Sequence, residues 1–219
     1  RQVESDLRAL YELHRTLSHA FPELPHPLVG SATAQQAADE ARKEVRCLFR
    51  VEESPRHGTV ILVQSRVEPD WEKLTAQHPT YLLASAEVKQ WEPKLARDTP
   101  LRFRLRANPT VKREGKRLPL RTEEQQLEWI GRQASSHGFS LPLKEFRRRD
   151  GSALTLPYAE VIEQEAQKHH RAESRTTHHA VLFEGVLTVT DTALFAEALA
   201  AGIGAAKGFG FGLLSVARA

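Results

Sequence analysis

The sequence predicts an α+β fold built from two βαββαβ cycles in tandem, the first of them without its opening strand. Three observations predict it. The chain has 219 residues, 40% hydrophobic and 27% charged, which suits two small domains with cores of their own. A stretch over 93–100 with a proline at each end divides the chain. On either side of that stretch, the same order of helices and strands recurs.

The first half, over 1–92, begins with an amphipathic helix. Apolar residues between positions 6 and 20 recur at the i, i+3, i+4, i+7 spacing of one helix face. The elements that follow are a helix over 33–43, strands over 46–52 and 59–66 joined by a turn over 54–58, a short helix from 69–71 to 76, and a strand over 85–91. This is the βαββαβ cycle without its first strand, and the chain also has no methionine. We therefore expect the first module to lack its opening strand in this chain.

The second half, over 101–219, supplies the full cycle. Residues 101–107 alternate apolar and basic side chains, which predicts a half-buried strand with Arg102, Arg104 and Arg106 on its outer face. An extended loop or hairpin over 108–120 precedes a helix that begins at the capping box over 122–125 and ends near 136. The later elements are strands over 139–148 and 180–190, a helix over 192–201 and a closing strand over 211–216, with a weak pattern over 150–177. Two tandem ferredoxin-like domains, 1–92 and 101–219, joined by a linker over 93–100, fit this order.

Positive charge is concentrated in a short part of the second half. The formal net charge is only +3, but residues 101–121 carry eight basic side chains and one acidic side chain. Such a patch is typical of a protein that binds a phosphate backbone, and a solvated basic face is the alternative. Ferredoxin-like sheets also occur in RNA-recognition modules, although the fold alone supports many functions.

Composition limits the compartment and the chemistry. No apolar run approaches the roughly 18–20 residues of a membrane span, and the N-terminus lacks a signal-peptide pattern, so we expect neither membrane association nor secretion. The single cysteine, Cys47, excludes an internal disulfide and any multi-cysteine metal site, and it fits a reducing cytoplasm. We expect the histidine pairs at 169–170 and 178–179 to be solvated loop residues rather than metal ligands.

Glycine is concentrated near the C-terminus, where five of the 12 glycines lie within eleven positions: Gly202, Gly204, Gly208, Gly210 and Gly212. The segment is neither a Walker loop nor a dinucleotide-binding loop, because Lys207 stands where the third glycine of the latter belongs and a strand follows. Glycine lets the backbone approach a ligand closely, and Lys207 adds a positive charge. We expect a ligand-facing or packing role, with a tight helix-to-strand turn as the alternative.

Four segments together carry a resemblance to a known family. They are YELHRTL over 11–17, LRFRLRANP over 101–109, VLFEG over 181–185 and KGFGFGLLS over 207–215. In this order, and over nearly the whole chain, they resemble the CasE family, the CRISPR-RNA-processing endoribonucleases of type I-E Cascade. The resemblance implies two ferredoxin-like domains and metal-independent cleavage of a repeat hairpin in precursor CRISPR RNA. It also implies that the product is retained with other Cascade subunits, without a small-molecule cofactor and without a metal.

The same resemblance points to His14 as the catalytic histidine. An imidazole with an ordinary pKa of about 6.5 can give or take a proton near neutrality, and the sequence leaves open whether His14 is the base or the acid. Tyr11 lies three residues earlier on the same helix face, and we expect it to orient the phosphate or hydroxyl. Ser18 and His19, one turn further, are weaker candidates for substrate contact. From the spacing alone, a histidine and a tyrosine on an apolar stripe are more often core or boundary residues.

The basic residues are expected to bind RNA. The expected contacts are Arg102, Arg104, Arg106, Lys112, Arg113, Lys116, Arg117, Lys207, Gly208 and Gly210. The three strand arginines would line the backbone of a stem, and the cluster over 112–117 would form a protrusion able to enter a groove. A further cluster at 147–149 is equally well explained as a solvated strand end. Two alternatives remain open: a catalytically inert RNA-binding subunit of the same superfamily, and a metal-dependent nuclease.

Overall fold

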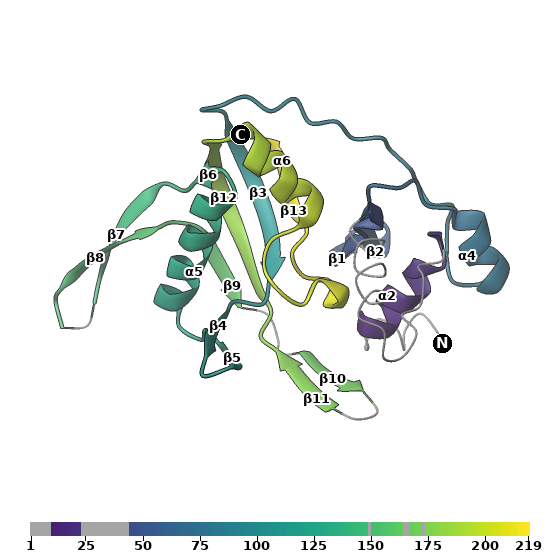
Figure 1. Ribbon diagram of the computed structural model, residues 1–219, viewed down its shortest axis with the longest axis horizontal. Coiled ribbons are helices and arrows are strands. Elements are labelled where there is room, and N and C mark those ends of the chain that lie inside the picture. Colours follow the sequence, from purple (N-terminus) through teal and green to yellow (C-terminus); the bar gives the residue numbers. More distant parts are fainter. Residues whose placement is uncertain (1–9, 23–43, 149, 164–166, 172–173) are drawn as a thin grey trace. The chain divides into compact units, whose positions relative to one another are not determined.

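The structure is a computed structural model that describes residues 10–22, 44–148, 150–163, 167–171 and 174–219. The chain divides into two compact units. Unit 1 consists of Arg1–Glu92 together with Gly208–Gly210, and unit 2 consists of Pro93–Lys207 together with Phe211–Ala219. Both units combine helices with antiparallel strands, so the predicted α+β class is confirmed (Figure 1). Within the described ranges, every helix is too short or too polar to span a bilayer.

The described residues of unit 1 include helices and one hairpin. In chain order these are α2 (Leu10–Ser18), β1 (Leu48–Ser54), β2 (Gly58–Gln64) and α4 (Trp71–Gln77). The two strands pair antiparallel across the predicted turn, and Asp70 caps α4 by accepting a hydrogen bond from the Lys73 backbone at 2.9 Å. This αββα order is the middle of a βαββαβ cycle. The predicted helix over 33–43 and the opening of the module lie outside the described residues.

The apolar stripe of α2 forms the core of unit 1. Leu10, Leu13 and Leu17 are buried, as the i, i+3, i+7 spacing predicts, and they pack in one cluster with Phe49 of β1 and Leu74 of α4. Residues Glu12, Arg15 and Ser18 are exposed on the opposite side. One side of α2 therefore faces the apolar core and the other faces solvent. Tyr11 and His14 lie between these two sides.

The predicted strand over 85–91 is wrong, because these residues are irregular and exposed. Val88 and Trp91 keep 52% and 44% of their surface accessible, so they have not found a sheet to pack on. In a ferredoxin-like sheet the fourth strand is an edge that pairs only with the first strand. Within the described part of unit 1 the paired strands are β1 and β2, which correspond to the second and third strands. Residues 85–91 thus have no first strand to join there.

Unit 2 is built on an antiparallel sheet with the order β13-β3-β12-β6. Its strands are β3 (Pro100–Ala107), β6 (Phe139–Ser140), β12 (Val181–Val189) and β13 (Leu214–Arg218), and β9 (Glu160–Glu163) also pairs with β12. Helix α5 (Glu123–Ser136) follows β3, and helix α6 (Thr192–Ala201) follows β12. Numbered along the chain, the strands lie in the order four, one, three, two, which is the ferredoxin-like arrangement (Figure 1).

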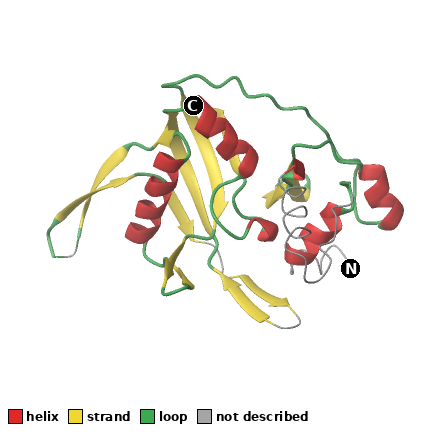
Figure 2. Cartoon of the chain, viewed as in Figure 1, coloured by secondary structure: helices red, strands yellow, loops and turns green. Residues whose placement is uncertain are grey.

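Helices α5 and α6 cover one face of this sheet, as Figure 2 shows. The alternation predicted for β3 is present, because Phe103 and Leu105 are buried on the helix side while Arg102 and Arg104 are exposed. Leu105 pairs in register with Phe183 of β12 and Leu214 of β13, and all three belong to one core. Burial of this apolar face is the main driving force for the fold of unit 2.

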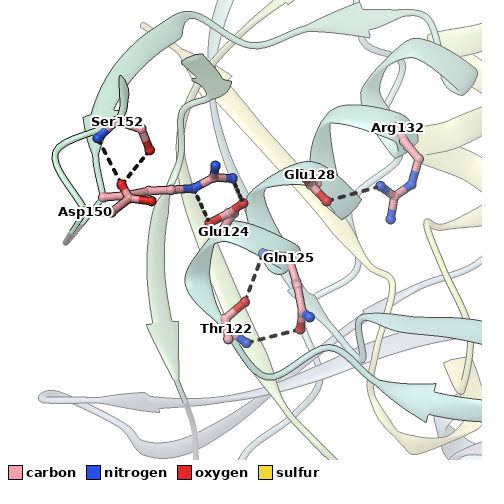
Figure 3. A network of polar contacts seen from close by, with 8 residues as sticks. Thr122, Glu124, Gln125, Glu128, Arg132, Asp150 and Ser152 are labelled. Carbon is pink, nitrogen blue, oxygen red and sulfur yellow. Dashed lines mark hydrogen bonds and ion pairs between the residues drawn. The ribbon is translucent and has the colours of Figure 1, made fainter. Parts of the chain in front are cut away.

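The start of α5 is fixed by local polar contacts, which Figure 3 shows. The Gln125 backbone donates to the Thr122 hydroxyl at 3.3 Å, and the Gln125 side chain accepts from the Thr122 backbone, so the predicted capping box is present. Arg148 donates to Glu124 in the first turn, and this bond raises the pKa of the Arg148 guanidinium. Nearby, hydrogen bonds from Ser152 lower the pKa of Asp150. The Arg148–Glu124 ion pair is exposed and contributes little to stability.

The predicted strand over 139–148 is two strands, β6 and β7 (Leu143–Arg147), separated by Leu141 and Pro142. A proline lacks the N–H that a ladder needs, and the Pro142 carbonyl instead accepts from the Tyr158 backbone at 2.7 Å. After it the chain forms hairpins that the weak pattern over 150–177 did not indicate. They are β7 with β8 (Ala153–Pro157), and β10 (Gln167–Arg171) with β11 (Ser174–His178). Strand β7 is mostly exposed, whereas β8 turns Leu154 and Leu156 toward the core and leaves Thr155 exposed, an alternation too short to indicate a strand by itself.

The closing strand is β13 at Leu214–Arg218 rather than the predicted range over 211–216. The preceding residues Phe211 and Leu213 are buried but lie outside the ladder, and Gly212 between them has φ +91°. An added Cβ at Gly212 would lie 2.8 Å from the Ile203 carbonyl oxygen. The backbone therefore approaches itself too closely here for any side chain, and the strand begins only after this contact.

Candidate functional site

Helix α2 places Tyr11 and His14 at the edge of the first core. Both side chains are half-buried, between fully buried leucines and the exposed Glu12 and Arg15. Three residues apart on a helix, they point to the same side. The spacing predicted this placement, and the boundary position leaves both side chains neither wholly in the core nor wholly in solvent.

A second segment of unit 1 lies against these two residues. It is Gly208–Gly210, which we call the glycine tip; the short 3₁₀ helix η1 (Lys207–Phe209) ends within it. The Tyr11 ring contacts the Phe209 ring at a centroid distance of 5.6 Å. A Cβ added at Gly208 would lie 3.4 Å from Cδ2 and 3.8 Å from Nε2 of His14. The glycine tip thus borders the catalytic candidates, which the sequence did not indicate.

The imidazole of His14 is held by an aromatic ring. It stacks on Phe49 of β1 with ring centroids 6.0 Å apart and an angle of 12° between the planes. Its Nδ1 atom is buried. An atom without accessible surface cannot reach a substrate, so Nε2 is the nitrogen able to exchange a proton with a bound ligand. Because the residue bordering this edge is Gly208, no side chain from that position covers it.

Gly210 has a structural requirement for glycine. Its φ is +73°, and an added Cβ would lie 3.1 Å from Cε2 of Phe49. Gly208 has no such backbone constraint. Of the two glycines expected to bind RNA, Gly210 therefore has a packing role on Phe49, while Gly208 lies beside the imidazole edge.

The two weaker candidates on α2 make other contacts. The Ser18 hydroxyl donates to the Arg15 carbonyl at 2.6 Å. The His19 imidazole lies parallel to that of His78, at the end of α4. Nδ1 of His19 lies 3.0 Å from Nε2 of His78. The Arg15 guanidinium pairs with Glu12 at 2.9 Å. These contacts connect neighbouring turns of α2 and join α2 to α4, so protein groups engage both the Ser18 hydroxyl and the His19 ring.

The three strand arginines do not share one environment, which corrects the expectation of a uniform outer face. Arg102 is exposed, and Arg104 is exposed and paired with Glu184 across the sheet at 2.5 Å. Arg106 is only 7% exposed, and its guanidinium carbon lies 4.5 Å from the centre of the Phe211 ring. Phe211 packs against this end of β3, so Arg106 is a buried cation–π partner rather than a surface residue.

The Phe211 ring also has a buried polar neighbour. His178 contacts Phe211 edge to face at 5.8 Å, and its Nδ1 lies 3.0 Å from the Asn108 side-chain nitrogen. His178 is 8% exposed, so the expectation of a solvated loop histidine is wrong at this position. The side chains of His169 and His170 lie outside the described residues. Within the described ranges no group of three or more histidine, cysteine or acidic residues could hold a metal ion.

The predicted protrusion over 108–120 is a hairpin formed by β4 (Thr110–Arg113) and β5 (Lys116–Pro119). Glu114 and Gly115 form its two-residue turn with φ values of +49° and +77°. Lys112 lies directly opposite Arg117, and Arg113 lies directly opposite Lys116. Like charges in cross-strand pairs destabilise a hairpin unless an anion or solvent compensates them. The hairpin therefore presents exposed positive charge on both of its faces.

Lys207, the remaining expected contact, is half-buried. A Cβ added at Gly212 would lie 3.3 Å from Cγ of Lys207, so the lysine stem packs along the backbone of the closing segment. The residues that sequence reasoning missed are Phe49, Phe209 and Phe211. The only signal for the last two was their position between glycines in KGFGFG.

Known proteins resemble this chain over nearly its full length. The profile of the family described as "CRISPR associated protein" matches residues 1–218. The CRISPR-associated endoribonuclease Cse3 of Thermus thermophilus is 33% identical over 223 residues, which cover 99% of this chain and 94% of the relative. The Cascade subunit CasE of Escherichia coli is 31% identical over 226 residues, 96% of this chain and 92% of the relative. The structure of Thermus thermophilus Cse3 bound to an RNA representing a pre-cleavage complex matches with a TM-score of 0.72 and 32% identity, over 99% of this chain and 93% of the other.

Proposed function

The chain belongs to the family of CRISPR-associated proteins, and on that basis we propose that it is a metal-independent endoribonuclease that cleaves the repeat stem-loop of precursor CRISPR RNA. The observation that carries the proposal is His14, which is half-buried on α2 with its Nδ1 covered and its Cδ2–Nε2 edge beside Gly208, a residue without a side chain. This is an arrangement that presents one imidazole nitrogen to a ligand. It occurs in a chain similar over nearly its full length to an endoribonuclease.

The chemistry needs two proton transfers. The 2′-hydroxyl beside the scissile phosphate loses its proton and attacks phosphorus, the bond from phosphorus to the 5′-oxygen breaks, and that oxygen gains a proton. The products are a 2′,3′-cyclic phosphate and a 5′-hydroxyl end. We assign one of the two proton transfers to Nε2 of His14, since imidazole exchanges protons readily near neutrality. Tyr11, on the same face of α2, donates a hydrogen bond that orients the phosphate.

RNA affinity would come mainly from exposed positive charge on unit 2. The hairpin residues Lys112, Arg113, Lys116 and Arg117 offer charge on two faces, and phosphate groups would relieve the repulsion within the cross-strand pairs. Arg102 adds charge on the open face of the sheet, where Arg104 is already paired with Glu184. We do not assign Arg106 to RNA contact, because its buried guanidinium packs on the Phe211 ring.

The product would stay bound as part of a larger assembly. The relative CasE is named as a Cascade subunit, and we extend this to the present chain: after cleavage it retains the processed RNA and associates with other Cascade subunits. We place this activity in the cytoplasm, where precursor transcripts are made.

The test is incubation of the protein with its host's own repeat RNA in EDTA. We expect cleavage, and no cleavage when the nucleotide at the scissile phosphate carries a 2′-deoxy sugar. Tight binding without cleavage would instead indicate a catalytically inert RNA-binding subunit. Cleavage that requires an added divalent cation would contradict the metal-independent mechanism.

A further inference from the structure

Phe49 on β1 contacts both the catalytic candidate and the glycine tip. Its ring lies parallel to the imidazole of His14, with centroids 6.0 Å apart. The same ring lies beneath Gly210, where an added Cβ would be 3.1 Å from Cε2 and 3.5 Å from Cζ. One aromatic side chain thus contacts both an imidazole on α2 and a backbone segment distant in sequence.

The Phe49 ring is itself firmly held. It has no accessible surface, it belongs to the core that contains Leu10, Leu13 and Leu17, and it pairs in register with Val63 of β2. A close-packed side chain on a strand has little freedom to change rotamer. Its ring can therefore act as a fixed surface against which a more mobile side chain is oriented.

His14 needs such a surface because it stands at the edge of the core. A half-turn of this half-buried imidazole about its χ2 angle would exchange Nδ1 with Cδ2 and Nε2 with Cε1, and so would move both nitrogens. Stacking on Phe49 restrains the plane of the imidazole, and in this plane Nδ1 is buried while the Cδ2–Nε2 edge borders Gly208. The geometry selects one of two nitrogens as the reactive one.

We propose that Phe49 is a positioning residue for the RNA cleavage reaction, because its ring holds the His14 imidazole with Nε2 toward the scissile nucleotide. This proposal rests on the proposed function, in which His14 transfers a proton during cleavage. Phe49 does not touch RNA in this account. It acts by keeping the distance and angle of proton transfer within a narrow range, on which reaction rates depend steeply.

The first test compares Phe49→Leu with the control Leu74→Ala. Leu74 has no accessible surface and lies in the same core, on α4 rather than beside His14, so its truncation destabilises unit 1 without removing the stacked ring. For Phe49→Leu we expect a single-turnover cleavage rate roughly tenfold to a hundredfold lower, with RNA affinity within about twofold of the wild type. The control should keep its rate, provided that melting curves show both variants to be folded at the assay temperature.

A rate for Phe49→Leu within about twofold of the wild type, or a loss that Leu74→Ala reproduces at equal stability, would overturn the proposal. Where Phe49→Leu is not folded, Gly210→Ala replaces it. The added methyl group pushes against the ring without deleting it, and we expect it to lower the rate in the same direction.

A second readout does not depend on cleavage. Proton–nitrogen correlation spectra of the free protein distinguish the two nitrogens of each imidazole, and the His14 signals are assigned by their loss in His14→Gln. We expect one tautomer in the wild type and altered nitrogen shifts in Phe49→Leu but not in Leu74→Ala. Unchanged His14 shifts in Phe49→Leu would refute the positioning role even if the protein proved to be an inert RNA binder, whereas altered shifts without cleavage would refute only the proposed function.

Discussion

Helix α2 with the glycine tip and the β4–β5 hairpin hold their functional side chains in opposite ways. His14 and Tyr11 are half-buried and each contacts an aromatic ring, so packing restrains their orientation. The hairpin side chains are exposed, and their like charges face one another across the strands. A group that transfers a proton needs a fixed position, whereas groups that attract a polyanion need only charge and reach. This difference supports the proposal that the first region carries out the chemistry and the second supplies RNA affinity.

Replacement of His14 should give the largest effect. For His14→Gln we expect a cleavage rate lower by about 10²–10⁴-fold, because general acid–base catalysis contributes about that much. Affinity for a 2′-deoxy repeat RNA that cannot be cleaved should stay near the wild-type value. Single-turnover kinetics and a binding titration measure the two quantities, and a rate that is not lowered would remove His14 from the mechanism.

The exclusion of water from the core of unit 1 can be measured at Cys47, which packs against the same cluster as Phe49. Burial raises the pKa of its thiol to about 12. A raised pKa lowers the thiolate fraction at pH 8, so alkylation of the folded protein should be at least about a hundredfold slower than alkylation in denaturant. Equal rates would show that solvent reaches this part of unit 1.

The hairpin should respond in affinity and in salt dependence. For Lys112→Gln combined with Arg117→Gln, we expect the slope of log affinity against log salt to fall by about one unit for each phosphate that the variant no longer binds. The cleavage rate at saturating protein should not change. The matched control is Arg132→Gln on α5, an exposed arginine that pairs with Glu128. If this control weakened binding as much as the hairpin variant does, the hairpin would have no special role.

The smallest of these effects should be a loss of stability at the glycine tip, in addition to the lower cleavage rate expected for Gly210→Ala. Gly210→Ala places a side chain at φ +73°, which costs about 1–2 kcal/mol of folding free energy. Gly208→Ala has no such backbone strain and should cost less. Urea unfolding of both variants checks the difference, and equal losses would mean that the backbone conformation of Gly210 carries no cost for a residue with a side chain.

Local features of the fold could be predicted from the sequence, because they depend on neighbouring residues. The capping box at Thr122 and the apolar stripe of α2 are such features, and both are present. The strand predicted over 85–91 failed because a strand needs a partner, and no local pattern shows whether that partner is present.

In the candidate site, too, the sequence predicted the local features and not the contacts between distant residues. The spacing of Tyr11 and His14 placed them on one side of a helix, but the stacking of His14 on Phe49 joins elements far apart in sequence. Arg106 alternates with apolar residues like Arg102 and Arg104, so the pattern placed all three on one outer face. Only the fold shows that Phe211 packs against Arg106 and takes it away from solvent.

The separation of chemistry from binding is tested most directly by one measurement, made in EDTA on repeat RNA: the single-turnover cleavage rate and the RNA affinity of His14→Gln and of the hairpin variant, side by side. The account predicts that the first variant loses rate and keeps affinity, while the second loses affinity and keeps its rate at saturation. If both variants lose the same quantity, or if each loses the one predicted for the other, the assignment of the two regions is contradicted.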